Sequence, residues 1–290
     1  MDGTFKTVPT VFRQLYTIHA PVGGENSRIL PLVYSLITSK SEEIYRSLFE
    51  ELVDFAAEND LTLQPSIILT DFELASINAS NYIFPNVKNK GCFFHLGQSG
   101  WWKIQSCGLA TRYGTDEQFS LMLRHLFALA FLPPQEIPEA FDILKLEMPS
   151  EANEVVQWFE DNYVHGKIRR HLRNKTVIRL APLFLSQLWS IYDLNEMGIP
   201  RTQNNIEAWH RRWEVLVGQS HIGVYKMIEE LQKEQRNVDL QVKSIICGEQ
   251  RPARKRTLIE RETRIMIIVN DRENCTVMDF LRGIAHNLTI

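Results

Sequence analysis

Three carboxylates stand in three short motifs that lie far apart along the chain. Asp2 opens the motif DGTF, Asp71 is the central residue of LTDFE, and Glu207 lies within NNIEAWH. Carboxylates on separate elements can converge on two divalent metal ions, which stabilise the attacking and leaving oxygens of an in-line displacement at phosphorus. The residue types therefore indicate metal-dependent cleavage or joining of phosphodiester bonds.

Each carboxylate also has an ordinary structural interpretation. Asp71 follows the apolar run SIILT (66–70), so we expect it at the rim of a sheet, but an Asp there also suits the N-cap of the next helix. The two roles can coexist. Asp2 alone is typical of a disordered terminus. Glu207 shares a predicted helix face with Asn204 and Arg211, and a solvated Glu207–Arg211 ion pair is the competing interpretation.

Cys92 and His95 form a Cys-x-x-His pair on or after a predicted strand. Such a pair is half of a zinc site, but the other cysteines, at positions 107, 247 and 275, have no matching spacing. A histidine near Asp71 that approaches a phosphate or a metal-bound water is the better functional hypothesis. A buried, hydrogen-bonded pair stays an alternative.

Six positive charges and no acid fall between residues 167 and 179. In a chain whose net charge is −3, binding to nucleic acid must rely on such local patches. A solubilising helix face is the alternative interpretation. The candidate DNA-contacting residues are Lys167, Arg169, Arg170, Arg173 and Lys175, together with Arg211 of the third motif.

The composition, with 44% hydrophobic and 23% charged residues, is that of an ordinary globular protein. No segment approaches the roughly 20 apolar residues of a membrane span, and the scattered cysteines favour a reducing compartment. We therefore expect a soluble intracellular protein.

Hydrophobic periodicity predicts an α/β fold, in which a mixed sheet is flanked by helices. The expected strands are 12–20, 29–38, 66–70 and 91–95, and the expected helices of this part are 42–56, 72–82 and 98–107. From about residue 115 to residue 195 the strand signal disappears, which predicts an all-helical insertion. A helix that begins near Thr202 carries Glu207, an amphipathic helix covers 222–242, and a basic linker (251–256) leads to a small terminal segment of mixed character.

Five runs in this order resemble the catalytic core of Mutator-like element (MULE) DNA transposases. They are DGTFK (2–6), QLYTIHA (14–20), LTDFE (69–73), GCFFHLGQ (91–98) and RTQNNIEAWH (201–210), and they cover roughly residues 1–215. The resemblance implies a ribonuclease-H-like fold with the helical insertion before the last catalytic acid. Gln203 departs from the family, in which Asn or another small polar residue is frequent.

The resemblance also implies the roles of the site residues. Asp2, Asp71 and Glu207 would be the catalytic metal ligands for two Mg²⁺ or Mn²⁺ ions, with Cys92, His95, Asn205 and His210 as accessory residues. The predicted domains are 1–112 (first part of the core), 113–198 (insertion), 199–245 (core completion) and 246–290 (C-terminal segment).

The resemblance implies that the protein acts on DNA, at transposon ends and at target sites, in the nucleus. It implies no association with a membrane and is compatible with a homo-oligomer. Only Met1 precedes Asp2, whereas in this fold the residues before the first Asp complete its strand. The sequence therefore predicts an N-terminally truncated transposase with impaired DNA cleavage and strand transfer. A domesticated DNA-binding or regulatory protein without catalysis, or a non-functional fragment, is the alternative.

Overall fold

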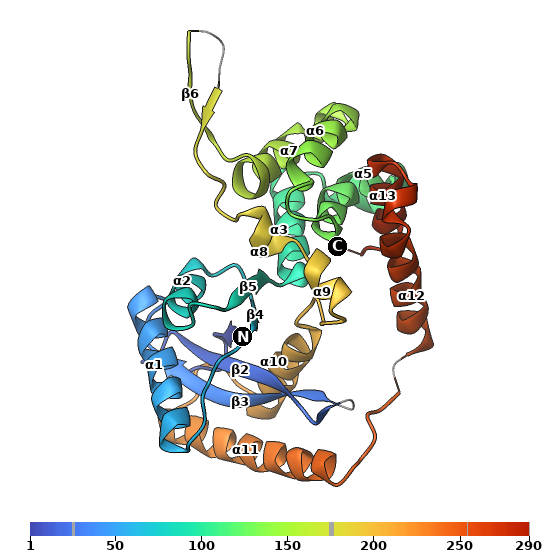
Figure 1. The fold of residues 1–290 in the computed structure, drawn as a ribbon. Coiled ribbons are helices and arrows are strands. Elements are labelled where there is room, and N and C mark those ends of the chain that lie inside the picture. The colour runs from blue at the N-terminus through green and yellow to red at the C-terminus, as the bar shows by residue number, and fades with distance from the viewer. Residues whose placement is uncertain (25–26, 174–176, 254, 290) are drawn as a thin grey trace. The chain divides into compact units, whose positions relative to one another are not determined.

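The computed structural model describes residues 1–24, 27–173, 177–253 and 255–289 (Figure 1). The chain forms two compact units, each built from two separate segments. The first unit comprises residues 1–89 and 203–253, and the second comprises residues 90–202 and 254–290. The architecture is mixed α/β, with small sheets and many helices. The predicted domain boundaries stay predictions.

The first unit is organised around an antiparallel sheet in the order β1-β2-β3. The strands are β1 (Asp2–Thr4), β2 (Gln14–Val22) and β3 (Arg28–Ile37). Asp2 pairs with Thr17, and Gly3 pairs with Tyr16. The expected strands at 12–20 and 29–38 are confirmed, with shifts of one or two residues at their ends.

Helices cover both faces of this sheet because successive side chains of β2 point to opposite sides. Tyr16 packs in a core with α1 (Glu42–Glu58) and α2 (Leu74–Ile83). Leu15, the residue before it, packs with Trp209 and Trp213 of α10 (Asn204–Val217) and with α11 (Val224–Ile246). The Ser41 side chain caps α1 by accepting from the Ile44 N–H, as its position before two glutamates predicts.

Two further strands, β4 (Ile67–Thr70) and β5 (Lys88–Gly91), form a two-stranded sheet. The expected strand at 91–95 is wrong, because β5 ends at Gly91 and a helix begins at Phe93. Phe93, Leu96 and Gly97 are buried at helical spacing. A short apolar run of this kind does not distinguish a strand from a buried helical turn.

The second unit is mainly helical. Its helices are α3 (Phe93–Ser106), α4 (Ala110–Thr115), α5 (Glu117–Ala128), α6 (Ile137–Glu147), α7 (Asn153–Phe159), α8 (Ser186–Trp189), α9 (Tyr192–Glu196), α12 (Arg256–Asn270) and α13 (Val277–His286). Its core contains the buried rings of Phe127, Phe141, Phe159 and Trp189. The predicted all-helical insertion is wrong in one place, since β6 (Ile168–His171) and β7 (Val177–Arg179) form an antiparallel pair.

The segment after residue 262, expected to be of mixed character, consists of the end of α12, a 3-10 turn (Arg272–Asn274) and α13. None of the helices in the described ranges combines the length and the apolar character needed to cross a membrane.

Candidate metal and active site

Asp2 is an ordered residue of a strand. The residue is only 6% exposed, and its Oδ1 accepts from the Gly3 N–H at 2.7 Å. The Thr17 hydroxyl donates to the Asp2 carbonyl oxygen at 3.3 Å, across the β1–β2 pair. The interpretation of Asp2 as terminal disorder is therefore wrong.

Asp71 follows β4 and shapes the turn into α2. Its Oδ1 accepts from the Thr70 hydroxyl at 3.2 Å and from the Glu73 N–H at 3.3 Å. The N-cap position of α2 belongs to Glu73, so Asp71 is not the cap. Glu73 accepts from the Tyr45 hydroxyl and from Lys40.

Glu207 lies in the first turn of α10, and two tryptophans fix the rotation of that helix. Trp209 Nε1 donates to Glu234 Oε1 at 2.7 Å, and Trp213 Nε1 donates to the Thr7 hydroxyl at 3.1 Å. Arg212 also pairs with Glu234, which is buried. Hydrogen bonds hold both indoles on the inner face of α10 and so fix the rotation of this helix about its axis. That rotation determines where Glu207 and His210 lie.

A single buried amide connects the elements that carry the three acids. Gln203 Nε2 donates to the Leu69 carbonyl at 2.7 Å and to the Met1 carbonyl at 3.2 Å. The Met1 nitrogen donates to the same Leu69 carbonyl at 2.7 Å. Met1 immediately precedes Asp2, Leu69 lies two residues before Asp71, and Gln203 lies one helical turn before Glu207. The starts of β1 and α10 and the end of β4 therefore meet at Gln203.

The structure brings two of the predicted metal ligands together. A carboxylate oxygen of Asp2 and one of Glu207 lie within 4.8 Å of each other, and among the described residues the carboxylate of Asp71 does not belong to this set. Oxygens bound to one Mg²⁺ at about 2.1 Å are roughly 3 Å apart on adjacent positions and about 4.2 Å apart on opposite ones. A pair of carboxylate oxygens within 4.8 Å of each other offers the oxygen ligands that a hard divalent cation prefers.

Two histidines adjoin Asp2. His210, a predicted accessory residue, is buried and places Nε2 3.5 Å from Asp2 Oδ2. His19 was not predicted. Its Nε2 lies 3.1 Å from the Thr17 hydroxyl, and its ring packs edge-on against Trp209. Burial lowers the pKa of His19 to about 3, with the Met1 amino group and His210 adding to the effect. His19 is therefore neutral at pH 7.

The signal for His19 was present in the run QLYTIHA, which contributes to the family resemblance. Its spacing alone does not reveal a site role, because the residue approaches Asp2 only through the pairing of β1 with β2. Asn205, another predicted accessory residue, is exposed in the first turn of α10.

Cys92 and His95 belong to the second unit. Cys92 is fully buried and occupies the N-cap position of α3, and His95 is half-buried in the first turn of that helix. Among the described residues no cysteine belongs to a cluster of potential metal ligands. This distribution gives no support to a structural zinc site.

The predicted DNA-contacting residues divide between the units. Lys167, Arg169, Arg170 and Arg173 lie on or next to β6 in the second unit and are all exposed. Arg211 is exposed on α10 of the first unit. Lys175 lies outside the described residues.

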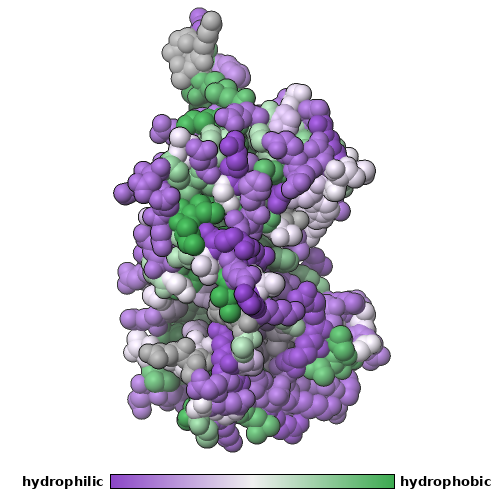
Figure 2. Space-filling view, turned by 90° about the vertical axis from the view of Figure 1, so that its right-hand side faces the viewer, coloured by the Kyte–Doolittle hydropathy of each residue, from purple (hydrophilic) through white to green (hydrophobic). Residues whose placement is uncertain are grey.

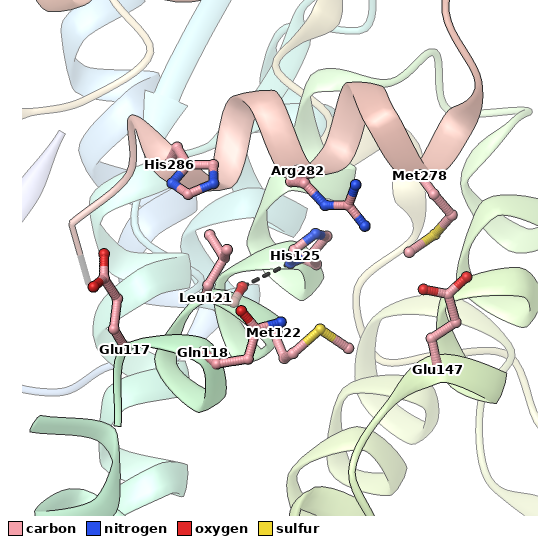
Figure 3. Close-up of a pocket in the computed structure, with 9 residues that line it drawn as sticks. All are labelled: Glu117, Gln118, Leu121, Met122, His125, Glu147, Met278, Arg282 and His286. Carbon is pink, nitrogen blue, oxygen red and sulfur yellow. Dashed lines mark hydrogen bonds between the residues drawn. The ribbon is translucent and has the colours of Figure 1, made fainter. Parts of the chain in front are cut away.

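A cavity of about 560 Å³ lies in the second unit between α5, α6 and α13 (Figure 3). None of the predicted site residues lines it. His125 Nδ1 lies 2.7 Å from the Leu121 carbonyl, and burial lowers the pKa of His125, with Arg282 and His286 acting in the same direction. The lining combines these groups with Glu117 and Glu147, and so shows no dominant charge.

The first unit thus has a mixed α/β fold in which a carboxylate of β1 and a carboxylate of α10 lie close together. Residues 1–99 match the family model of the MULE transposase domain. The matched region contains Asp2, Asp71, Cys92 and His95 and ends before Glu207. Over these residues the chain is therefore similar to this transposase family, and the resemblance is confirmed there. A transposase domain implies an interaction with DNA in general. No curated protein and no solved structure gives a significant match to the chain.

Proposed function

We propose that the first unit is the metal-dependent DNA-cleaving core of a MULE-type transposase, with a ribonuclease-H-like arrangement of its strands. The observation that carries this proposal is the approach of Asp2 and Glu207, from opposite ends of the unit's sequence, to within 4.8 Å. The family match over residues 1–99 supplies the substrate class, DNA.

Asp2, Asp71 and Glu207 would hold two Mg²⁺ or Mn²⁺ ions. Bound there, the ions would stabilise the charge that develops on the attacking and leaving oxygens of a phosphodiester. Asp2 would contribute its carboxylate from β1, which pairs with β2, and the preceding residue, Met1, donates to the Leu69 carbonyl of β4. Asp71 would contribute its carboxylate from the end of β4, and Glu207 would contribute its carboxylate from α10.

The remaining site residues shape the surroundings of these acids. His210 adjoins Asp2, and neutral His19 adds no charge that would repel a cation. Asn205 is available to a substrate at the exposed start of α10. We keep Cys92 and His95 as accessory residues on the family resemblance, and we propose a nuclear protein that acts on transposon ends and target DNA, with self-association as a further proposal.

Nicking of a supercoiled plasmid in Mn²⁺ tests the proposal. Asp71→Asn should lower the rate at least about 100-fold, because it removes several kcal/mol of transition-state stabilisation. The matched control is Asp54→Asn, which neutralises an exposed acid on α1 and should leave the rate unchanged. Equal nicking by the wild type and the Asp71→Asn variant would refute metal catalysis at this site.

The second candidate is a DNA-binding or regulatory protein that has kept the fold without catalysis. The exposed basic segment around β6 favours it, because none of its residues belongs to the acidic site. This candidate predicts DNA binding that Asp71→Asn does not change and no nicking in any divalent metal. A fragment without function would instead lack a cooperative unfolding transition.

A further inference from the structure

The strands β6 and β7 form a two-stranded ribbon that extends from the helices of the second unit (Figure 1). All seven residues from Lys167 to Arg173 are exposed. An isolated two-stranded ribbon is marginally stable in water. Its presence therefore raises two questions, namely what holds its base and what its exposed residues contact.

The base of the ribbon is firmly attached to the helical core. Arg179, at the end of β7, donates to the Gly166 carbonyl at 2.7 Å and to Glu160 Oε1 at 2.6 Å. Lys145 of α6 holds the other oxygen of Glu160, which is 2% exposed. Gly166 has φ +80°, and a Cβ there would lie 1.9 Å from the Leu180 carbonyl oxygen. The chain thus leaves the core at a fixed angle.

β6 and the residues next to it present positive charge without internal neutralisation. Within the described ranges, Lys167, Arg169, Arg170 and Arg173 form no ion pair, whereas Arg179 at the base is neutralised by Glu160. Apolar side chains lie among these cations, with Ile168 44% and Leu172 37% exposed, and Figure 2 shows apolar surface near the top of the molecule, where the ribbon lies. Cations interleaved with short apolar groups are suited to phosphates and base edges.

We propose that this ribbon docks in the major groove of duplex DNA, with Arg169 and Arg170 on the phosphates of the groove walls. The major groove of B-form DNA, about 12 Å wide, admits a two-stranded ribbon, whereas the major groove of A-form RNA is deep and narrow. The register shift between Ile168 and Arg170 marks a bulge, which increases the twist of a ribbon and so helps it to follow a helical groove. The inference rests on the proposed function for its substrate class.

Fluorescence anisotropy in EDTA tests the inference without requiring metal or catalysis. The probes are a 30-base-pair DNA duplex, the RNA duplex of the same sequence and one DNA strand. The variant Arg169→Gln/Arg170→Gln should lose at least about tenfold in affinity for the DNA duplex, and the slope of log K against log salt should fall by about 2. The control Lys88→Gln/Arg236→Gln removes two exposed cations of the first unit and should bind as the wild type does.

Three outcomes would overturn the inference: equal losses in both double variants, wild-type affinity in Arg169→Gln/Arg170→Gln, or RNA-duplex binding as tight as DNA-duplex binding. Gly166→Ala provides a second check, because it moves the base of the ribbon without changing charge and should also weaken DNA binding. The substituted arginines are exposed, so the melting temperature of their double variant should equal that of the wild type. If binding falls as expected but no Asp71-dependent nicking occurs, the ribbon inference stands and the proposed catalysis fails. If nicking depends on Asp71 but the arginine substitutions do not weaken DNA binding, the proposed catalysis stands and the ribbon inference fails.

Discussion

The carboxylates of Asp2 and Glu207 face each other at a distance at which like charges repel. Asp2 is buried and Glu207 is half-buried, so the repulsion is less screened than it would be at the surface. The mutual repulsion of the two carboxylates is unfavourable, and a bound cation offsets it. The proposed site therefore predicts opposite effects of one substitution in the absence and in the presence of metal.

Glu207→Gln should raise the free energy of unfolding by about 1 kcal/mol in EDTA, because it removes one charge of the pair at nearly constant volume. In millimolar Mn²⁺ the same variant should gain less stability from the metal than the wild type gains. Denaturant titration under both conditions measures the two effects. A variant that is destabilised in EDTA would show that Glu207 makes a favourable contact instead.

At this scale the sequence singles out the three acids as candidates but says little about their surroundings. The sequence motifs around Asp2, Asp71 and Glu207 single these acids out as candidate ligands, because each acid stands in a distinctive run. Gln203 looked like a minor departure from the family, yet its amide bonds to the carbonyls of Met1 and Leu69. Those carbonyls meet only in three dimensions, so spacing along the chain does not reveal the role.

At the scale of elements, Gln203 holds the starts of β1 and α10 against the end of β4. Its amide donates to the carbonyls of Met1 and Leu69, of which the Leu69 carbonyl also accepts from the Met1 nitrogen. Losing a buried hydrogen bond of this kind costs about 1–3 kcal/mol. We therefore regard Gln203 as a positioning residue, since the structure shows its amide on the backbones that carry the acids.

Gln203→Leu should lower the unfolding free energy by about 1–3 kcal/mol and should also weaken Mn²⁺ binding. Gln203→Asn, with a shorter amide, should restore part of the metal response, which a purely packing role would not produce. The metal concentration at half-maximal stabilisation is the measurement for both variants. An unchanged metal midpoint in Gln203→Leu would leave Gln203 with a structural role only.

The elements of the first unit were largely predictable, because strands β2, β3 and β4 and helix α1 carry the expected periodicity and cap. Two predictions failed for physical reasons. The run from Gly91 to His95 is too short to separate a strand from a helical turn. All residues of β6 are exposed, so this strand has no apolar alternation that would reveal it in the sequence.

At the scale of the whole molecule, both units are built from segments that are distant in sequence. The C-terminal helices complete the second unit. Arg124 of α5 donates to the Leu288 carbonyl at 3.1 Å, and Arg272 pairs with Glu136 at 2.8 Å. Phe280, Leu281 and Ile284 of α13 are almost fully buried. The terminal segment is therefore part of a core, which its separate position in the sequence did not indicate.

Phe280→Ala should lower the unfolding free energy of the second unit by about 3–5 kcal/mol, because it leaves a cavity among buried side chains. Leu258→Ala, on the exposed side of α12, should change it by less than about 0.5 kcal/mol. Thermal or denaturant unfolding distinguishes the two. A small effect in Phe280→Ala would mean that α13 is dispensable for the second unit.

Thermal unfolding with and without millimolar Mn²⁺ tests the central claim, an assembled acidic metal site, most directly. At 100 times its Kd, a bound ion stabilises the folded protein by about 2.7 kcal/mol. Mn²⁺ should raise the Tm of the wild type and of the Asp54→Asn control, and it should not raise the Tm of Asp71→Asn. A rise of the same size in all three proteins, or no rise in the wild type, would contradict it.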